Sequence, residues 1–259
     1  MMKLVLAAVA LFGLIGSATA ETLTVGAYPA NPPWEVKQED GSFVGFEVDL
    51  VNAIADKLGM DAEFQDLGFQ ALFAATSSGR IDLAISTITI TDERLQNQDF
   101  TQGYYDADMA MGVREGSGVT ALEDLDGQDV GVLSASTGEK WALANKETYG
   151  IANVRGYDAY TQMLLDAQNG RVAAVITDLP GMLFAFKNMN GMAAGEIIPT
   201  GDRYGIMLGK GSDLTGPIND AISALKEEGV LAKIHETHFG VSPTPGSSTV
   251  TVLDLPSAQ

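Results

Sequence analysis

The stretch RIDLAISTITITDERLQNQDF, residues 80–100, decides how this chain folds. Apolar residues recur through residues 81–90 as in a buried strand, and a serine and threonines gather toward its C-terminal end. Thr91 then stands where a helix N-cap is expected, and two acidic residues follow in a first turn that favours negative charge. Arg94 comes next. Hydroxyls at a strand end, a helix start and a guanidinium group together predict a pocket for a small carboxylate.

The composition indicates a folded chain of one or two domains. The 259 residues are 46% hydrophobic, which is enough for sizeable cores, and 34 acidic against 15 basic residues give a formal charge of −19. Such a charge repels nucleic acid and anionic lipid surfaces, so we expect no nucleic-acid partner. The sequence contains no cysteine, which excludes disulfides, thiol catalysis, cysteine zinc sites and a lipid anchor on cysteine.

The first residues have the pattern of a secretory signal peptide. Lys3 provides a positive end, residues 4–15 form an apolar run, and residues 18–20 are a small-residue cleavage site before Glu21. The apolar run is shorter than the roughly 20 residues that an ordinary membrane span needs. We therefore expect residues 1–20 to be a cleaved signal peptide.

The chain that follows predicts alternating strands and helices. A strand over residues 23–27 is followed by a proline-stiffened loop over residues 28–34, and loops at such strand ends hold ligands in open α/β sheets. Apolar residues then recur every fourth position from Phe46 to Leu58, which predicts an amphipathic helix with Gly59 just beyond its end. Further strands and helices continue a β-α-β-α-β order into the opening stretch.

An internal repeat indicates two similar lobes. Residues 69–80 span eleven positions and end in Gly-Arg before an apolar strand that closes on Ser86. Residues 160–171 span the same eleven positions, also end in Gly-Arg, and precede a strand that closes on Thr177. The repeated spacing predicts two α/β lobes in one chain.

The remaining segments connect and close these lobes. Residues 104–113 and 203–208 are predicted to cross between the lobes as extended segments. Residues 214–239 are helical in pattern, with a break at Gly229. The tail from residue 241 is rich in proline, glycine, serine and threonine, and we expect it to be poorly ordered.

Three features are candidates for binding a small zwitterion. The planar fork of Arg94 matches a carboxylate, although an exposed arginine paired with its acidic neighbours is an equal alternative. Asp178 either binds an ammonium group or is an ordinary N-cap before Pro180. The loop over residues 134–138 either offers backbone N–H groups to the same carboxylate or simply caps a helix.

Catalytic, metal and cofactor sites have little support in the sequence. There is no Gly-x-Ser-x-Gly, no Ser-His-Asp arrangement and no Gly-x-Gly-x-x-Gly. His235 and His238 lie three apart, but no third ligand accompanies them, which favours packing or solvent exposure. We therefore expect no catalytic residue, no metal and no cofactor.

The pattern as a whole resembles the periplasmic amino-acid-binding proteins of ABC importers, solute-binding protein family 3, which includes histidine- and glutamine-binding proteins. The resemblance covers residues 22 to 240. Its segments occur in the family's order and are VGFEVDL (44–50), GRIDLAIS (79–86), TITDER (89–94), DFTQGYY (99–105), VGVLSAST (130–137) and GIMLGKGSDL (205–214).

The resemblance implies an α/β fold of two Rossmann-like lobes joined by a two-strand hinge, the type II periplasmic binding protein fold. Lobe 1 is then residues 21–108 with 203–240, lobe 2 is residues 109–202, and residues 241–259 are a flexible tail. It also implies a monomer in the periplasm that binds an amino acid and partners a cognate ABC permease of the inner membrane.

The site residues follow from the same resemblance. Arg94 is expected to hold the ligand's α-carboxylate, helped by backbone N–H groups of Thr89 and Thr137. Asp178 and the carbonyl of Ser86 are expected to hold the α-ammonium group. The other expected pocket positions are Phe69, which packs against the ligand, and Thr87, Leu133, Ser136 and Gly138.

Two departures from the family pattern bear on the ligand's side chain. Asn31 stands where the family often has an aromatic residue, and Tyr28 stands where binders of basic or amide side chains carry aspartate. Loss of that aspartate predicts a neutral or polar side chain. Cyclohexadienyl or arogenate dehydratases use similar clamps and are the enzymatic alternative, but Asp178 keeps the ammonium anchor and favours binding without catalysis.

Overall fold

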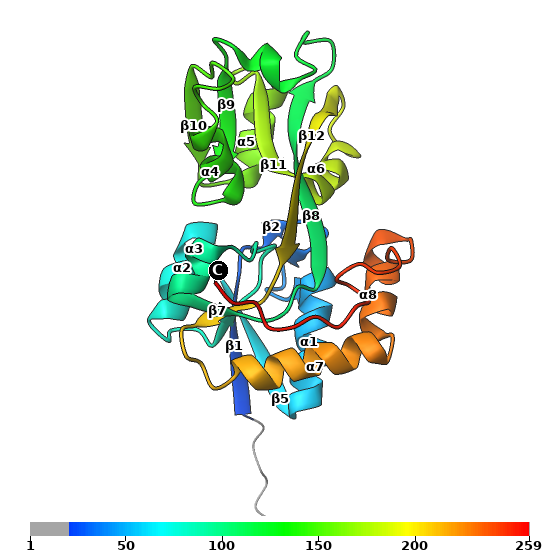
Figure 1. The fold of residues 1–259 in the computed structure, drawn as a ribbon. Coiled ribbons are helices and arrows are strands. Elements are labelled where there is room, and N and C mark those ends of the chain that lie inside the picture. The colour runs from blue at the N-terminus through cyan, green and yellow to red at the C-terminus, as the bar shows by residue number, and fades with distance from the viewer. Residues whose placement is uncertain (1–20, 259) are drawn as a thin grey trace, which may run out of the picture.

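The computed structural model describes residues 21–258 as two α/β lobes, one above the other in Figure 1. The predicted signal peptide lies outside the described residues. One five-stranded sheet, of order β5-β1-β6-β13-β7, forms the centre of lobe 1, and another, of order β10-β9-β11-β8-β12, forms the centre of lobe 2. A small sheet of order β2-β3-β4 lies on lobe 1.

The elements of lobe 1 come from both ends of the described chain. They are β1 (Glu21–Ala27), β2 (Ala30–Asn31), β3 (Glu35–Lys37), β4 (Phe43–Val44), α1 (Phe46–Leu58), β5 (Met60–Asp66), α2 (Phe69–Ser77), β6 (Leu83–Ala84), α3 (Asp92–Asn97), β7 (Gln98–Phe100), β13 (Met207–Gly209), α7 (Thr215–Glu227) and α8 (Val230–Phe239).

The elements of lobe 2 are continuous in sequence. They are β8 (Tyr105–Arg114), the 3-10 turn η1 (Leu122–Leu125), β9 (Asp129–Leu133), α4 (Thr137–Ala144), β10 (Asn153–Tyr157), α5 (Tyr160–Gln168), β11 (Ala174–Asp178), α6 (Leu179–Phe186) and β12 (Met192–Tyr204).

Both sheets are mixed. In lobe 1, β1 pairs in parallel with β5 and β6, and β13 runs antiparallel to β6 and β7. In lobe 2, β9 pairs in parallel with β10 and β11, and β8 runs antiparallel to β11 and β12. The parallel strands require helical crossovers, so the loops after β1, β6, β9 and β11 emerge at sheet edges where ligands commonly bind.

The first long helix, α1, is built as its sequence pattern predicts. Its buried face includes Phe46, Leu50 and Ile54 at a spacing of four, and these side chains pack into the core of lobe 1. Gly59 ends the helix in the left-handed conformation, with φ of 68°, which glycine adopts without a steric penalty.

The internal repeat predicted from the eleven-residue spacing is present. α2 and α5 each have nine residues and begin at Phe69 and Tyr160. Gly79 and Gly170, which follow them, both have positive φ, at 68° and 73°. The strands that come next, β6 and β11, lead into the cavity from lobe 1 and from lobe 2, so the repeat supplies one half of the cavity from each lobe.

The strands β8 and β12 cross from one lobe to the other (Figure 1). They pair antiparallel, but their register shifts between Ala194 and Ile197 and again between Ile198 and Asp202. At the second shift the backbone N–H groups of Thr200 and Gly201 donate to the Asp108 carboxylate, at 2.9 and 3.0 Å. The two crossing strands therefore have a bulged segment within their ladder.

The strand predicted for residues 81–90 is shorter in the structure than the apolar pattern indicates. Within residues 81–90 only Leu83 and Ala84 belong to a sheet strand, and the chain then turns through Thr87, which has φ of +47°. Ile85 and Ile88 are nevertheless fully buried. Their apolar character reflects core packing rather than ladder pairing, which periodicity alone does not distinguish.

The C-terminal tail packs against lobe 1, contrary to the expectation of a poorly ordered segment. Ser248 and Thr249 are buried; the N–H and hydroxyl of Ser248 both donate to Asp106, and Thr249 Oγ1 donates to the Tyr104 carbonyl at 3.0 Å. Lys226 Nζ donates to the carbonyl of Thr251 at 2.9 Å. In Figure 1 the tail, in red, runs across lobe 1 past the base of the crossing strands.

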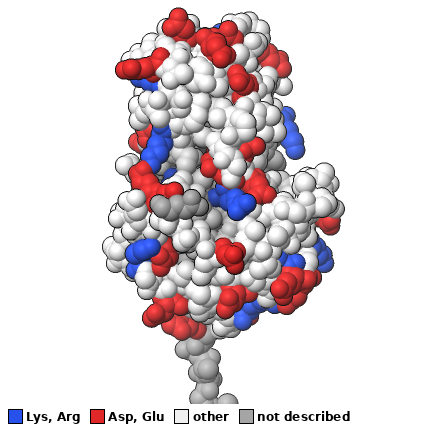
Figure 2. Space-filling view, viewed as in Figure 1, with Lys and Arg blue, Asp and Glu red and all other residues white. Residues whose placement is uncertain are grey.

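The surface carries the acidic excess of the sequence. Figure 2 shows acidic side chains spread over the visible face of both lobes, with a hollow between the lobes. Within residues 21–258, none of the helices has the length and apolar character that a membrane span requires.

Candidate functional site

A cavity lies between the two lobes and encloses about 570 Å³, its open mouth included. All twelve residues expected from the sequence line it, namely Tyr28, Asn31, Phe69, Ser86, Thr87, Thr89, Arg94, Leu133, Ser136, Thr137, Gly138 and Asp178. It also has five lining residues that were not predicted, namely Trp34, Tyr160, Thr177, Gly181 and Tyr204.

Arg94 comes from the first turn of α3 and reaches toward lobe 2. Thr91 caps this helix as predicted, because its side chain accepts from the Arg94 N–H at 3.2 Å. The guanidinium group donates from Nη1 to the Thr89 carbonyl at 2.7 Å and from Nη2 to the Ala135 carbonyl at 3.1 Å, and it stacks on Phe73 at 4.9 Å. Burial lowers the pKa of Arg94 to about 10, so the group is still charged at neutral pH.

These contacts leave donors for a ligand. A guanidinium group has five N–H donors in a fixed fork, and the two carbonyls use only two of them. The alternative of a solvent-exposed arginine paired with its acidic neighbours does not describe Arg94, whose charged end lies at the cavity. Sequence reasoning expected Thr89 to contribute its N–H group, which stays a prediction; in the structure the Thr89 carbonyl accepts from Arg94 and so orients it.

Asp178 lies at the end of β11, in the opposite wall of the cavity. Although it occupies the N-cap position of α6, its side chain makes no capping hydrogen bond. Its Oδ2 instead accepts from the hydroxyl of Tyr204 at 2.7 Å. Burial raises the pKa of Asp178 to about 6, and the nearby Arg94 opposes that shift. The carboxylate is thus mostly ionised at neutral pH and is available for an ammonium group.

The loop after β6 presents Ser86 and Thr87 to the cavity in a strained conformation. The left-handed φ of Thr87 is unusual for a β-branched residue and costs of the order of 1 to 3 kcal/mol. Its N–H donates to Glu47 Oε1 at 2.8 Å, and its hydroxyl accepts from Asn31 Nδ2 at 3.2 Å. The Ser86 hydroxyl donates to Glu35 Oε1. Two glutamates behind the cavity therefore hold this loop.

The loop after β9 brings the N-terminus of α4 to the cavity. Ser136 caps the helix by accepting from the Glu139 N–H at 3.1 Å. The N–H groups of Thr137 and Gly138, in the first turn, have no acceptor within the helix and face an anion favourably. A Cβ at Gly138 would lie 2.5 Å from the Ile176 carbonyl, so only glycine permits this approach of α4 to β11.

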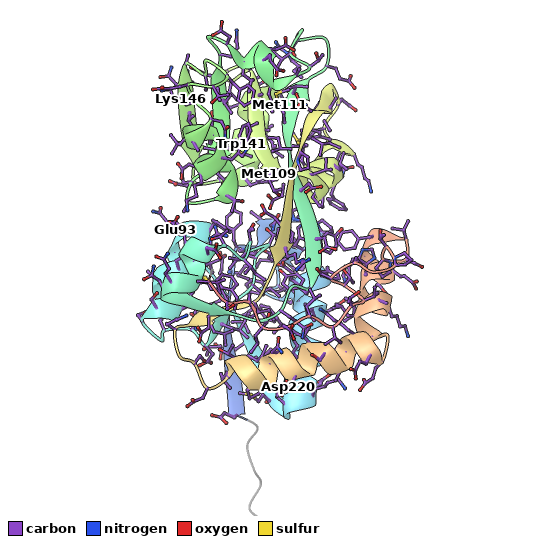
Figure 3. All side chains as sticks on the ribbon, viewed as in Figure 1. Glu93, Met109, Met111, Trp141, Lys146 and Asp220 are labelled. Atoms are coloured by element: carbon purple, nitrogen blue, oxygen red, sulfur yellow. The ribbon has the colours of Figure 1, made fainter. Side chains whose placement is uncertain are left out.

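Contacts between the lobes surround the cavity. The Tyr160 N–H of lobe 2 donates to the Tyr28 hydroxyl of lobe 1 at 2.9 Å, and Arg94 bonds Ala135 across the same gap. At the rim Glu93 and Lys140 form an ion pair between the lobes. Figure 3 shows Glu93 on the side of lobe 1 that is turned toward lobe 2. The two lobes are therefore in direct contact at the cavity.

The unpredicted lining residues are mostly aromatic or small. Trp34 is fully buried and packs edge-on against Phe46, Tyr105 and Tyr204. Tyr160 begins α5 at the position equivalent to Phe69 in the repeat, and that equivalence was the signal that could have placed it at the cavity. Tyr204 ends the crossing strand β12 and carries no local sequence signal of its own.

The charge distribution of the cavity is simple. Among the residues between 21 and 258 that line it, Arg94 of lobe 1 and Asp178 of lobe 2 are the two charged side chains. A positive group thus lies on one wall and a negative group on the other, as a zwitterion with adjacent carboxylate and ammonium groups requires.

Comparison with known proteins identifies the family of this chain. Residues 23–241 match the profile of the bacterial extracellular solute-binding proteins, family 3. The chain belongs to that family. This family 3 protein is 32% identical over 232 residues to the L-arginine-binding protein of Pseudomonas aeruginosa, covering 86% of this chain and 89% of that one. It is also 32% identical over 231 residues to the L-cystine-binding protein TcyJ of Escherichia coli K12, covering 86% and 84%.

The fold of this family 3 protein is shared with a solved structure. The arginine-, lysine-, histidine-binding protein ArtJ from Geobacillus stearothermophilus matches it with a TM-score of 0.80 at 32% identity, over 86% of this chain and 97% of that one. The predicted type II periplasmic binding protein fold is confirmed. The protein binds amino-acid solutes, and because these relatives are binding proteins, they give the dehydratase alternative no support.

Proposed function

We propose that this protein captures a free amino acid with a neutral or polar side chain by closure of its two lobes, and delivers it to an ABC permease. The observation that carries the proposal is the pair of charged groups on opposite walls of the cavity, Arg94 and Asp178. Arg94 holds the α-carboxylate, aided by the free N–H groups at the start of α4. Asp178 holds the α-ammonium group together with the carbonyl of Ser86.

The other residues that line the cavity are uncharged, which supports a ligand whose side chain is neutral or polar. Apart from Arg94 and Asp178, the lining residues within 21–258 are neutral, and Tyr28 and Asn31 offer a hydroxyl and an amide. A cationic side chain such as that of arginine would meet no carboxylate of its own there, and a buried unpaired charge is costly. The similarity to a cystine-binding relative, as high as that to an arginine-binding one, is compatible with this view.

Closure follows from the division of the site between lobes. A ligand held by Arg94 in lobe 1 gains its contact with Asp178 only when lobe 2 approaches, so its differential affinity favours the closed state.

We propose residues 21–108 with 203–240 as lobe 1 and residues 109–202 as lobe 2, and a monomer as the working form. Export to the periplasm by a cleaved signal peptide agrees with membership of an extracellular family.

A ligand screen tests the proposal. The mature chain is heated with each of the twenty L-amino acids and with L-cystine, and a ligand at about 100 times its Kd should stabilise the folded state by roughly 2.7 kcal/mol. We expect neutral or polar amino acids to raise the melting temperature more than arginine or lysine do. The side-chain assignment is wrong if arginine gives the largest shift, and the whole proposal is wrong if no amino acid gives any.

A further inference from the structure

Two glutamates lie fully buried behind the cavity and face each other without a cation. Glu35 of β3 and Glu47 of α1 each have no exposed surface, and their carboxyl groups are close enough to hydrogen-bond each other. Within residues 21–258 the Oε2 atom of each has no donor. Two ionised carboxylates in this contact would repel strongly in a dry site, so a proton shared by the two carboxyl groups removes that repulsion.

The backbone forces these two side chains together. Gly45 precedes α1 with φ of 142°, and a Cβ there would lie 2.1 Å from the carbonyl oxygen of Trp34. The first N–H groups of α1 donate to the same segment, from Phe46 to the Pro33 carbonyl and from Glu47 to the Trp34 carbonyl, both at 3.0 Å. Main-chain contacts therefore hold the start of α1, which carries Glu47, against the segment that leads into Glu35.

The surroundings decide which glutamate carries the proton. Glu47 lies in the first turn of the 13-residue helix α1, where the helix dipole favours negative charge. Its Oε1 accepts from the hydroxyl of Tyr104 and from the Thr87 N–H. Glu35 lies in the strand β3, where no helix dipole favours its charge. It accepts only from the Ser86 hydroxyl and, at 3.4 Å, from Asn31 Nδ2. Glu35 is therefore the acid and Glu47 the carboxylate.

We propose that Glu35 and Glu47 share a single proton, with the Glu35 acid donating to the Glu47 carboxylate, and that this pair positions Ser86 and Thr87 for binding. The proposal rests on the proposed function in giving those two residues contact with the ligand. Glu47 holds the N–H of the left-handed Thr87, and Glu35 fixes the hydroxyl of Ser86. Full ionisation of the pair would separate the carboxyls and release the loop.

The titratable groups around the pair agree with one retained proton. Burial, and then the charge of Glu47, raises the pKa of Glu35 well above its usual value. Burial also raises the pKa of Glu47, while hydrogen bonds from Glu35, Tyr104 and Thr87 act against that shift. The tyrosines that face the pair stay neutral, because burial raises their pKa values; they are Tyr28, Tyr104 and Tyr204.

Three other groups near the pair also titrate, and the experiment must distinguish their effect on stability from that of the two glutamates. Asp178 accepts from the hydroxyl of Tyr204, and burial raises its pKa to about 6. His235 packs on the ring of Phe46 and is hydrogen-bonded to the Val241 carbonyl. Lys226, whose pKa burial lowers to about 8, contacts neither glutamate. Comparison of variants at each pH cancels all three contributions.

The first test counts the proton without any ligand. Urea unfolding of the full mature chain is measured between pH 7 and pH 9 for the wild type, Glu35→Gln and the control Glu39→Gln, an exposed carboxylate beyond β3. An acid protonated only in the folded state loses its stabilising effect as pH rises toward its folded pKa. The unfolding constant of the wild type should therefore rise tenfold per pH unit relative to Glu35→Gln, until the pair loses its proton. Parallel curves for these two proteins would overturn the shared proton.

A label gives the same answer without a variant, in case Glu35→Gln does not fold. In the NMR spectrum of wild type carrying a carbon isotope label at the glutamate side-chain carboxyl, one carboxyl resonance should have the chemical shift of the protonated acid at pH 7. A spectrum in which every glutamate is ionised would overturn the proposal.

The second test concerns positioning. An equimolar mixture of the twenty L-amino acids should raise the melting temperature of the wild type by an amount that falls with pH as the pair ionises, and more steeply than in Glu35→Gln. Equal pH profiles would show that the pair does not position the binding loop. Absence of a shift at any pH would contradict the proposed function, whereas the unfolding comparison would still decide the proton.

Discussion

Truncation of Arg94 is the sharpest perturbation of the proposed site. In Arg94→Ala a buried, charge-assisted contact with the ligand carboxylate is lost, and such truncations cost about 2 to 5 kcal/mol. At about 1.4 kcal/mol per factor of ten, affinity should fall roughly 30- to 5000-fold. A ligand with a Kd of about 1 μM for the wild type would then bind the variant with a Kd between roughly 30 μM and 5 mM.

The folded state should survive this change. The guanidinium group also bonds the carbonyls of Thr89 and Ala135, and each net contribution is about 0.5 to 1.5 kcal/mol. Part of that loss is offset, because alanine no longer buries a charge. We expect a melting temperature lower by a few degrees and an unchanged circular dichroism spectrum.

Titration calorimetry with the amino acid selected by the screen measures the effect. Arg80→Ala is the matched control, because Arg80 is an exposed arginine outside the cavity, and it should bind as the wild type does. Arg94→Lys keeps a positive charge without the planar fork and should bind between the two. Wild-type affinity in Arg94→Ala, with the fold intact, would refute the carboxylate assignment.

Three further outcomes follow from the structure. Burial raises the pKa of Asp178 from 3.8 to about 6, so the folded, ligand-free protein loses stability as pH rises between these values and has lost about 3 kcal/mol by pH 7. Asp178→Asn should therefore stabilise the ligand-free protein by up to about 3 kcal/mol at pH 7 in urea unfolding, yet abolish calorimetric binding. Tyr28→Phe removes the acceptor of the Tyr160 N–H and should weaken binding by about 1 to 3 kcal/mol, whereas Tyr157→Phe, altered outside the cavity, should not. Deletion of the chain after Gly246 should lower thermal stability by about 1 kcal/mol for each hydrogen bond lost from the tail, and an unchanged melting temperature would contradict its packing.

The sequence predicted those parts of the fold that local chemistry determines. The four-residue spacing from Phe46, the glycine at 59 and the threonine cap at 91 each specify one helix end or face, and each is confirmed. The eleven-residue repeat predicted two lobes because a repeated local pattern needs no knowledge of distant contacts. All twelve predicted site residues line one cavity, and their roles in binding stay predictions.

The remaining features depend on contacts between distant parts of the chain. A tail rich in proline and serine reads as disordered, but its partners Asp106 and Lys226 lie far away in sequence. The hydroxyl of Tyr204 reaches Asp178 only after the crossing strand has returned to lobe 1. Ile81, Ile85 and Ile88 are buried without belonging to a strand, and a pattern of apolar residues reports burial more directly than hydrogen bonding.

The bulge in the crossing strands has a mechanical consequence. After the first register shift, Ile197 and Ile198 pair with Ala110 and Met109, and pairing resumes beyond the second shift at Asp202 with Ala107. Between Ile198 and Asp202 the N–H groups of Thr200 and Gly201 donate to the side chain of Asp108 in β8 instead of to a main-chain carbonyl of that strand. A side-chain carboxylate can follow a rotating backbone by changing its torsion angles. We therefore expect the bulged segment between Ile198 and Asp202 to act as a hinge. The lobes can then separate while the main-chain hydrogen bonds of β8 and β12 before and after this segment stay intact.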